Sequence, residues 1–270
     1  MTWINKGKFC VNSFLSALKI PHVISTKKFG NLKNPEIFRE FIELLKKEDL
    51  FQNCNLDTDN IFLGEQKHTA NYFEIKNHQT SSLIKNNDGF YSAVSGVGMG
   101  VYTADCMPIF LVVPSKRISA LLHSGWKGVE LDITGKCISE IMQKYGCEND
   151  EIFIVIGPHL KSCCYEVGKE FKQNFELEER QVKGEKKYFL DMQKNFVKKM
   201  INFGIPENNI KLSNFCTGCS KDLLVGQNFT GSCETETKKI ASSDSLFFSY
   251  RLDGAKENRM MSVLWNKIEN

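Results

Sequence analysis

The sequence predicts a single mixed α/β (α+β) domain spanning residues 1–270. Short apolar runs typical of strands alternate with stretches of helical periodicity, without a regular βαβ repeat. No linker rich in Pro, Gly or Ser divides the chain, and it contains no internal repeat. With 41% apolar and 11% aromatic residues, a chain of 270 residues can bury a substantial core.

The first half of the chain is expected to contain one long helix followed by strands. Asn34 and Pro35 are typical of an N-cap and a first helical position, and the apolar stripe after them predicts an amphipathic helix that ends near Asp49. The next apolar runs are short, which favours strands. These strands are expected at residues 61–63, 97–102, 109–113 and 118–122.

The second half alternates helices and strands. Apolar spacing of three to four after Gly128 predicts a helix that stops at Gly146. The apolar run 152–156 ends in a Gly-Pro turn, as expected for a buried strand. Asp191 is a suitable N-cap for a helix that ends at Phe203. The remaining segments are a helix at 168–176 and strands at 210–215, 246–250 and 260–265.

Composition excludes several classes of protein. The net charge is only +3 and the lysines are spread along the chain, so we expect no nucleic-acid partner. No apolar run reaches the roughly 18 residues of a membrane span, and no secretory signal is recognised, so we expect no membrane partner and a cytoplasmic location. The ten cysteines should then be mostly reduced thiols. No glycine-rich nucleotide-binding loop follows a predicted strand.

Cys106 and His123 stand at the ends of neighbouring predicted strands, where their side chains can face one small volume. His68, just after another predicted strand, is the best third partner. Two imidazoles and one thiolate suit zinc and leave a fourth position for water or substrate. Spacing alone leaves two alternatives open. Cys106 could be a nucleophile with His123 as its base, or all three could be ordinary structural residues.

Five spaced motifs, taken together, are more specific than this pair. In chain order they are Asp88-Gly89, Thr103-Ala104-Asp105-Cys106-Met107-Pro108, His123-Ser124-Gly125-Trp126-Lys127-Gly128, Gly157-Pro158 through Cys164-Tyr165-Glu166-Val167-Gly168, and Phe247-Phe248-Ser249-Tyr250-Arg251. Over about residues 64–265 the sequence resembles the YfiH-like family. That family was long labelled multicopper polyphenol oxidoreductase, or laccase domain, and is now associated with purine nucleoside phosphorylase activity.

The resemblance implies a fold of mixed sheets sandwiched between helices, and a metal site. Its ligands would be His68, Cys106 and His123, and its metal would be zinc, with copper as an alternative occupant. The older name can be tested against the composition. A blue multicopper oxidase needs about ten histidine ligands, whereas this chain has five histidines in total. The resemblance therefore does not imply laccase chemistry here.

The implied reaction is phosphorolysis of adenosine, guanosine, inosine or methylthioadenosine, with adenosine deamination as a second activity. The partners would be small molecules, namely purine nucleosides and phosphate, and we expect a monomer. Cleavage of an N-glycosidic bond creates positive character on the ribose and negative charge on the departing base. An acid near the base and cations around phosphate would both lower the barrier.

The resemblance also suggests roles for residues around the metal site. Asp105 is the first candidate for proton transfer or ribose contact and, with Cys106 and His123, forms the expected catalytic set. In a regular strand its side chain would point away from that of Cys106, so the role needs a break in the strand near Pro108.

Three further residues are candidates for substrate binding. Lys127 and Arg251 are the most plausible phosphate cations, although Lys127 stands where the family usually has Arg and so lacks bidentate geometry. Trp126 could stack on a purine or could fill part of the core, and both interpretations stay open.

An insertion at residues 217–246 departs from the family pattern. The insertion contains Cys219 and Cys233, and Cys216 lies just before it. These three cysteines could hold a second metal, but no fourth ligand is evident nearby. A longer surface loop is the preferred interpretation. Two other functions also remain open for the chain. One is a cysteine hydrolase or deamidase with a Cys106/His123 dyad, and the other is a non-enzymatic metal-binding or redox-responsive protein.

Overall fold

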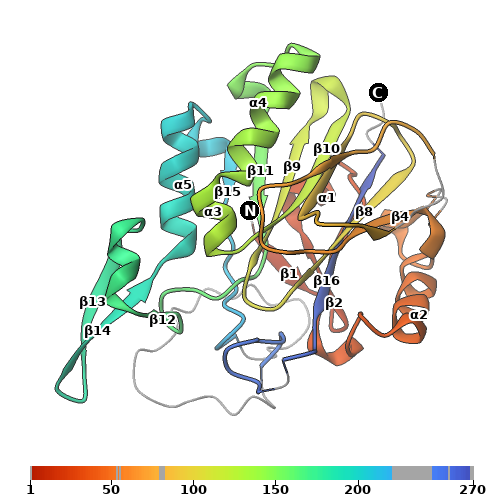
Figure 1. Ribbon diagram of the computed structural model, residues 1–270. Coiled ribbons are helices and arrows are strands. Elements are labelled where there is room, and N and C mark those ends of the chain that lie inside the picture. Colours follow the sequence, from red (N-terminus) through yellow and green to blue (C-terminus); the bar gives the residue numbers. More distant parts are fainter. Residues whose placement is uncertain are drawn as a thin grey trace.

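A computed structural model describes residues 2–52, 54, 56–78, 83–220, 245–254 and 256–267. Two sheets pack face to face, and helices cover their outer sides (Figure 1). In spatial order, the first sheet contains β1 (Trp3–Asn5), β2 (Phe9–Asn12), β3 (His22–Ser25), β16 (Met260–Asn266), β8 (Val97–Thr103), β4 (Ile61–Gly64) and β6 (Leu83–Ile84). The second contains β15 (Ile210–Lys211), β11 (Phe153–Ile156), β9 (Met107–Val113), β10 (Ile118–Ser124), β7 (Gly89–Ser92) and β5 (Phe73–Glu74).

The helices lie on opposite outer faces of this pair of sheets. Figure 1 shows α2 (Pro35–Leu45) outside the first sheet, and α3 (Trp126–Leu131), α4 (Ile133–Tyr145) and α5 (Met192–Phe203) outside the second. A short helix, α1 (Ser13–Ala17), follows β2. A small sheet of β12 (Glu166–Val167), β14 (Glu185–Leu190) and β13 (Leu177–Val182) projects from the body. The predicted mixed α/β class, with sheets between helices, is confirmed.

The apolar side chains form three layers, and β9 shows why. Phe110 and Val112 belong to the layer between the two sheets, while Ile109 and Leu111 face the layer shared with α4 and α5. Every residue of β9 is therefore buried. A strand covered on both faces gives a continuous apolar run instead of an alternating one, which is the pattern in the sequence.

Several predicted elements differ from the structure. The first helix ends at Leu45, short of Asp49. The predicted helix at 168–176 is only a 3₁₀ turn, Lys169–Gln173, and the chain then enters β13. The predicted strand at 210–215 is limited to β15, and that at 246–250 does not form.

The apolar run at 246–250 is buried without pairing to a sheet. Phe247 is fully buried between the sheets, and the Ser245 hydroxyl donates to the Phe247 carbonyl at 3.0 Å, which holds a turn in place of a strand. No helix within the described ranges is long and apolar enough to cross a membrane.

Candidate metal centre

The two central residues are brought together by the hairpin of β9 and β10. Cys106 immediately precedes β9, and His123 lies near the end of β10, paired with Pro108. A break between the two strands is present as required, but it lies at Asp105 itself, whose φ is 87°, and Pro108 is part of β9. His68 comes from the loop after β4 and also has a positive φ, 60°.

His68, Cys106 and His123 converge as predicted. One donor atom from each lies within 4.8 Å of the other two. The ring centroids of His68 and His123 are 4.8 Å apart, and the ring planes meet at 74°. His123 is buried, Cys106 is half-buried and His68 is exposed, so the group opens to solvent on the His68 side.

Gly125 allows this close approach. A Cβ atom at that position would lie 2.6 Å from the Cys106 sulfur, a distance that real Cβ atoms do not adopt. Gly125 is also the N-cap of α3, so the turn that leads from β10 into the helix passes directly beside the thiol. A side chain there would displace Cys106 from the group.

Asp88 anchors two of the three candidate ligands, a role that the sequence analysis missed. Its Oδ1 accepts from His123 Nδ1 at 2.8 Å and from the His68 amide at 3.0 Å. Its Oδ2 accepts from the amide and hydroxyl of Thr69, both at 2.7 Å. Because Nδ1 of His123 is engaged by Asp88, its Nε2 is left to face Cys106 and His68. The only signal in the sequence was the Asp88-Gly89 motif.

The charges within this group support one another. Burial opposes ionisation of the Cys106 thiol, but the charge of His123 and hydrogen bonds from both histidines outweigh it and lower the pKa of Cys106 to about 6. Burial also opposes the charge on His123, yet Cys106 and Asp88 raise its pKa to about 9. Despite its burial, Asp88 has its pKa lowered to about 2 by hydrogen bonds from His123 and Thr69. The group therefore favours a thiolate.

This donor set fits a soft divalent cation. A thiolate and two imidazoles can serve as three ligands, Asp88 orients His123 from behind, and the exposed side leaves room for a fourth ligand. The same cysteine, histidine and aspartate could also form a nucleophile, its base and an orienting acid. His68 distinguishes the two, because a nucleophilic dyad has no need of it.

Asp105 lies beside the group but its carboxylate is directed inward. Oδ1 accepts from the Thr217 hydroxyl at 2.7 Å, and Oδ2 accepts from the Arg251 amide at 2.9 Å. Burial raises the pKa of Asp105. With both oxygens engaged within the protein, Asp105 fixes the backbone of the segment that carries Arg251.

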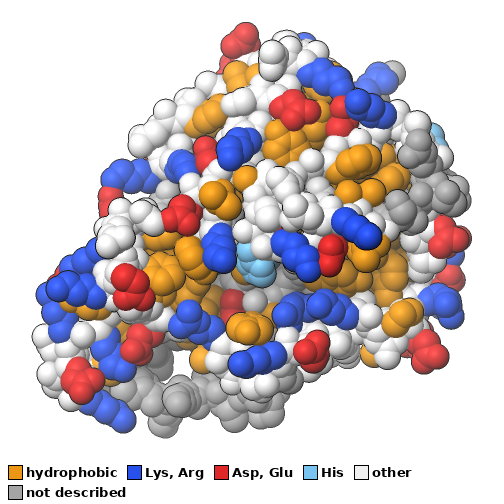
Figure 2. Space-filling model, in the orientation of Figure 1, with side chains coloured by type: hydrophobic (Ala, Val, Ile, Leu, Met, Phe, Trp, Pro, Cys, Tyr) orange, Lys and Arg blue, Asp and Glu red, His pale blue; other side chains and the backbone are white. Residues whose placement is uncertain are grey.

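The candidate phosphate cations are both exposed. Arg251 places its guanidinium 4.9 Å from the centroid of the Tyr165 ring and donates through Nη1 to the Glu166 carbonyl at 2.6 Å. Lys127 places its Nζ 5.4 Å from the centroid of the Trp126 ring. The view in Figure 2 shows a histidine side chain in a hollow near the centre of this face, with Lys and Arg side chains around it.

Trp126 fills part of the core, which is one of its two predicted roles, while stacking on a purine stays a prediction. It is half-buried and packs against the layer between the second sheet and its helices, where its ring centroid lies 5.0 Å from that of Phe171. The rest of its surface remains open to solvent.

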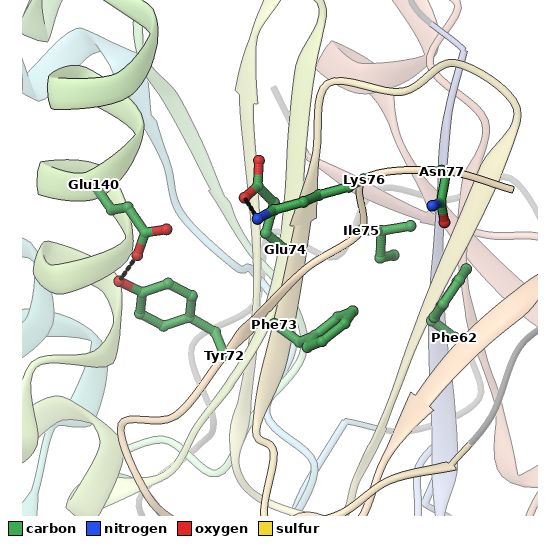
Figure 3. Close-up of a pocket in the computed structure, with 8 residues that line it drawn as sticks. All are labelled: Phe62, Tyr72, Phe73, Glu74, Ile75, Lys76, Asn77 and Glu140. Atoms are coloured by element: carbon green, nitrogen blue, oxygen red, sulfur yellow. Dashed lines mark hydrogen bonds and ion pairs between the residues drawn. The ribbon is translucent and has the colours of Figure 1, made fainter. Parts of the chain in front are cut away.

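A separate pocket of about 380 Å³ is not the candidate centre. Figure 3 shows two pairs among its polar side chains: the Tyr72 hydroxyl donates to Glu140 at 2.7 Å, and Lys76 lies 3.5 Å from Glu74. None of the three candidate ligands lines it.

The family described as multi-copper polyphenol oxidoreductase laccase matches residues 45–225. The chain belongs to this family.

Individual relatives of the chain are named for other activities. A purine nucleoside phosphorylase of Clostridium acetobutylicum is 33% identical over 199 residues, 72% of either chain. A purine nucleoside phosphorylase of Aquifex aeolicus is 32% identical over 76% of this chain and 83% of its own length. Adenosine deaminase RL5, from an unknown prokaryotic organism, is 28% identical over 63% and 70% of the two chains.

Two solved structures share the fold of this chain. YfiH of Bacillus licheniformis has a TM-score of 0.74 at 21% identity, with 97% of each chain covered. YlmD of Geobacillus stearothermophilus has the same TM-score and coverage at 20% identity. The family resemblance seen in the sequence is confirmed.

Proposed function

We propose that the protein is a purine nucleoside phosphorylase built around one zinc site. Its substrates would be phosphate and adenosine, guanosine, inosine or methylthioadenosine, with adenosine deamination as a side activity. The observation that carries the proposal is the convergence of His68, Cys106 and His123 within 4.8 Å, in a chain whose relatives are named for these two activities. The monomeric state and cytoplasmic location expected from the sequence stay predictions.

The zinc ion would be coordinated by three side chains of this protein, and a fourth side chain would orient them. His68, Cys106 and His123 would coordinate the metal, and Asp88 would hold His123 and the His68 backbone in place. When bound, zinc would add positive charge and an open coordination position beside the substrate, and copper is an alternative occupant.

Arg251 and Lys127 would bind phosphate at the rim of the site. A guanidinium binds two phosphate oxygens at once, whereas an ammonium acts as a point charge. Arg251 is the better candidate because Asp105 fixes its backbone amide at 2.9 Å. The same contact gives Asp105 a structural role. We propose it as a positioning residue for Arg251, in place of direct proton transfer, because both of its oxygens are engaged.

Trp126 would supply an apolar wall next to the phosphate cations. Its core contact with Phe171 would hold the ring in one orientation, and its open surface is available to a purine face. The wall would bind the base without distinguishing among purines, which suits a range of nucleosides.

The test is an assay of the purified chain with inosine or adenosine, with and without phosphate. We expect free base and ribose 1-phosphate in equal amounts, formed only when phosphate is present. Release of ammonia and inosine from adenosine would reveal the deamination separately. Absence of both base and ribose 1-phosphate at high enzyme concentration would contradict the phosphorylase and favour a non-enzymatic role.

A cysteine hydrolase is the second candidate, favoured by the Cys106–His123–Asp88 arrangement. A thiolate that binds a metal is a poor free nucleophile, so metal content separates the two functions. Loss of one equivalent of zinc in Cys106→Ala supports the phosphorylase. Activity in metal-free protein, abolished by alkylation of Cys106, would support the hydrolase.

A further inference from the structure

We propose that Cys163, Cys164, Cys216 and Cys219 bind a second metal ion, a zinc coordinated by four thiolates. Their sulfur atoms all lie within 4.8 Å of one another. In the sequence, Cys216 and Cys219 are grouped with Cys233, which lies outside the described residues. The fold supplies a different pair, Cys163 and Cys164.

The spacing of the sulfurs fits a single ion. The Cys163 sulfur is 3.5 Å from the sulfurs of both Cys216 and Cys219. A tetrahedral zinc with four bonds of about 2.3 Å places its sulfurs about 3.8 Å apart, within the range seen here. A four-iron cluster would hold its cysteines farther apart, because each thiolate binds a different iron.

The donor chemistry also indicates zinc. All four candidate ligands are thiol sulfurs, which prefer soft or borderline cations over magnesium or calcium. Four cysteines would fill a tetrahedral shell and leave no position for water or substrate, which is the arrangement of structural zinc sites. This cluster therefore differs in kind from the three-donor centre at Cys106.

Backbone hydrogen bonds already shape the two loops that would hold the ion. Cys216 and Cys219 lie on one tight turn, in which the Ser220 amide donates to the Cys216 carbonyl at 3.0 Å and the Cys216 amide donates to the Ser220 hydroxyl at 2.8 Å. In the other loop, the Cys164 amide donates to the Lys161 carbonyl at 2.9 Å. The Lys161 amide lies 3.5 Å from the Cys216 sulfur, a contact that would stabilise a thiolate ligand.

An ion at this position would fix a turn that contacts the candidate catalytic region. Thr217, inside the Cys-x-x-Cys turn, donates its amide to the His159 carbonyl at 2.9 Å and its hydroxyl to Asp105 at 2.7 Å. The Ser245 hydroxyl lies 3.0 Å from the Thr217 carbonyl and can donate to it or to the Phe247 carbonyl. The free energy of metal binding would add to the stability of both loops. The metal would thus hold Thr217, the partner of Asp105, in place from outside the substrate site.

The first test measures metal in the purified 270-residue chain by mass spectrometry. We expect two zinc equivalents in the wild type, one in Cys219→Ser, one in Cys106→Ala, and two in the control Cys147→Ala, whose cysteine belongs to neither group of candidate ligands. The second test examines the zinc that remains in Cys106→Ala by X-ray absorption. We expect four sulfur ligands at about 2.3 Å.

Two results would overturn this proposal. One is the absence of metal, or a shell containing nitrogen or oxygen, in Cys106→Ala. The other is a disulfide within the cluster of the wild type, found by mass spectrometry under non-reducing conditions, with no metal beyond that bound by Cys106. The X-ray absorption test does not depend on the folding of a cluster variant. None of these readouts uses the enzymatic assay, so the proposal stands or fails separately from the proposed function.

Discussion

The two cysteine-containing groups differ in what surrounds their sulfurs. The first combines one thiol with two imidazoles, is anchored by the buried Asp88, and is exposed at His68. The second consists of four thiols on two loops, with Cys216 buried and the other three half-buried. An open shell with three donors suits chemistry on a bound molecule, whereas a shell of four donors suits the fixing of loops. We therefore assign reactivity to the first group and the stabilisation of loops to the second.

Partial removal of metal should give the largest effect on activity. It tests directly whether the three-donor centre is more open to solvent than the four-cysteine cluster. Brief treatment with a chelator should reach the metal on the exposed His68 side before the enclosed one. We expect phosphorolysis to fall at least about 1,000-fold, more than the 10–100-fold typical of losing an outer-shell partner, while one zinc equivalent remains. Added zinc should restore the rate. Loss of both ions before any loss of activity would contradict the assignment.

Acid can destabilise the protein by protonating buried groups or by releasing metal. His22 allows the first effect to be measured separately, because it belongs to neither group of candidate ligands. Its Nε2 accepts from the Asn12 amide at 2.6 Å and its Nδ1 faces the Ile20 carbonyl at 2.7 Å, so the ring is neutral. Burial lowers the pKa of His22 from 6.5 to about 4. Between these two pKa values the unfolded chain binds a proton at His22 and the folded chain does not. The free energy of unfolding therefore decreases as the pH falls from 6.5 to about 4.

The expected loss through His22 is about 3 kcal/mol across that interval. Denaturant unfolding of the wild type and of His22→Gln at pH 7 and pH 4.5 measures it. The wild type should lose more stability on acidification than His22→Gln does. Equal losses in the two proteins would show that His22 does not titrate as described.

Asp88→Asn tests the support behind the three-donor centre. An amide has one accepting oxygen where the carboxylate has two, so the contacts to His123, His68 and Thr69 cannot all survive. We expect zinc affinity and phosphorolysis to fall about 10–100-fold, with the second zinc retained. The surface variant Asp150→Asn serves as the control. Unchanged zinc affinity in Asp88→Asn would remove Asp88 from the account.

Arg251→Ala should have the smallest of these effects and concerns only substrate binding. Loss of one charge-assisted contact predicts a rise of about tenfold in KM for phosphate, with both metals retained. Arg39→Ala, on the exposed side of α2, provides a matched loss of charge. A change in kcat with no change in the KM for phosphate would assign Arg251 a different role.

The sequence predicted the parts of the fold that have local signals. The runs that form β8, β9 and β10 were recognised because both faces of these strands are buried, and α5 was bounded by its Asp191 cap and Gly204. The run at 246–250 was misread because burial between sheets selects the same apolar residues whether or not a strand forms.

The two cysteine-containing groups also show that contacts between distant parts of the chain leave no local signal in the sequence. The three-donor centre was predicted through spaced motifs, although the contacts made by Asp88 were not. Cys163 and Cys164 could not be paired with Cys216 from the sequence, because about 50 residues separate them. Tertiary structure joins them: β11 and β15 run side by side, and His159 bridges to Cys216 immediately after these strands.

The most direct test compares Cys106→Ala and Cys219→Ser side by side, with zinc content and the initial rate of ribose 1-phosphate formation measured on each sample. The account predicts that Cys106→Ala retains one zinc and loses phosphorolysis. It predicts that Cys219→Ser also retains one zinc but keeps most of its phosphorolysis while unfolding at a lower temperature. Phosphorolysis that survives in Cys106→Ala and disappears in folded Cys219→Ser would contradict the central claim that the open centre is the catalytic one.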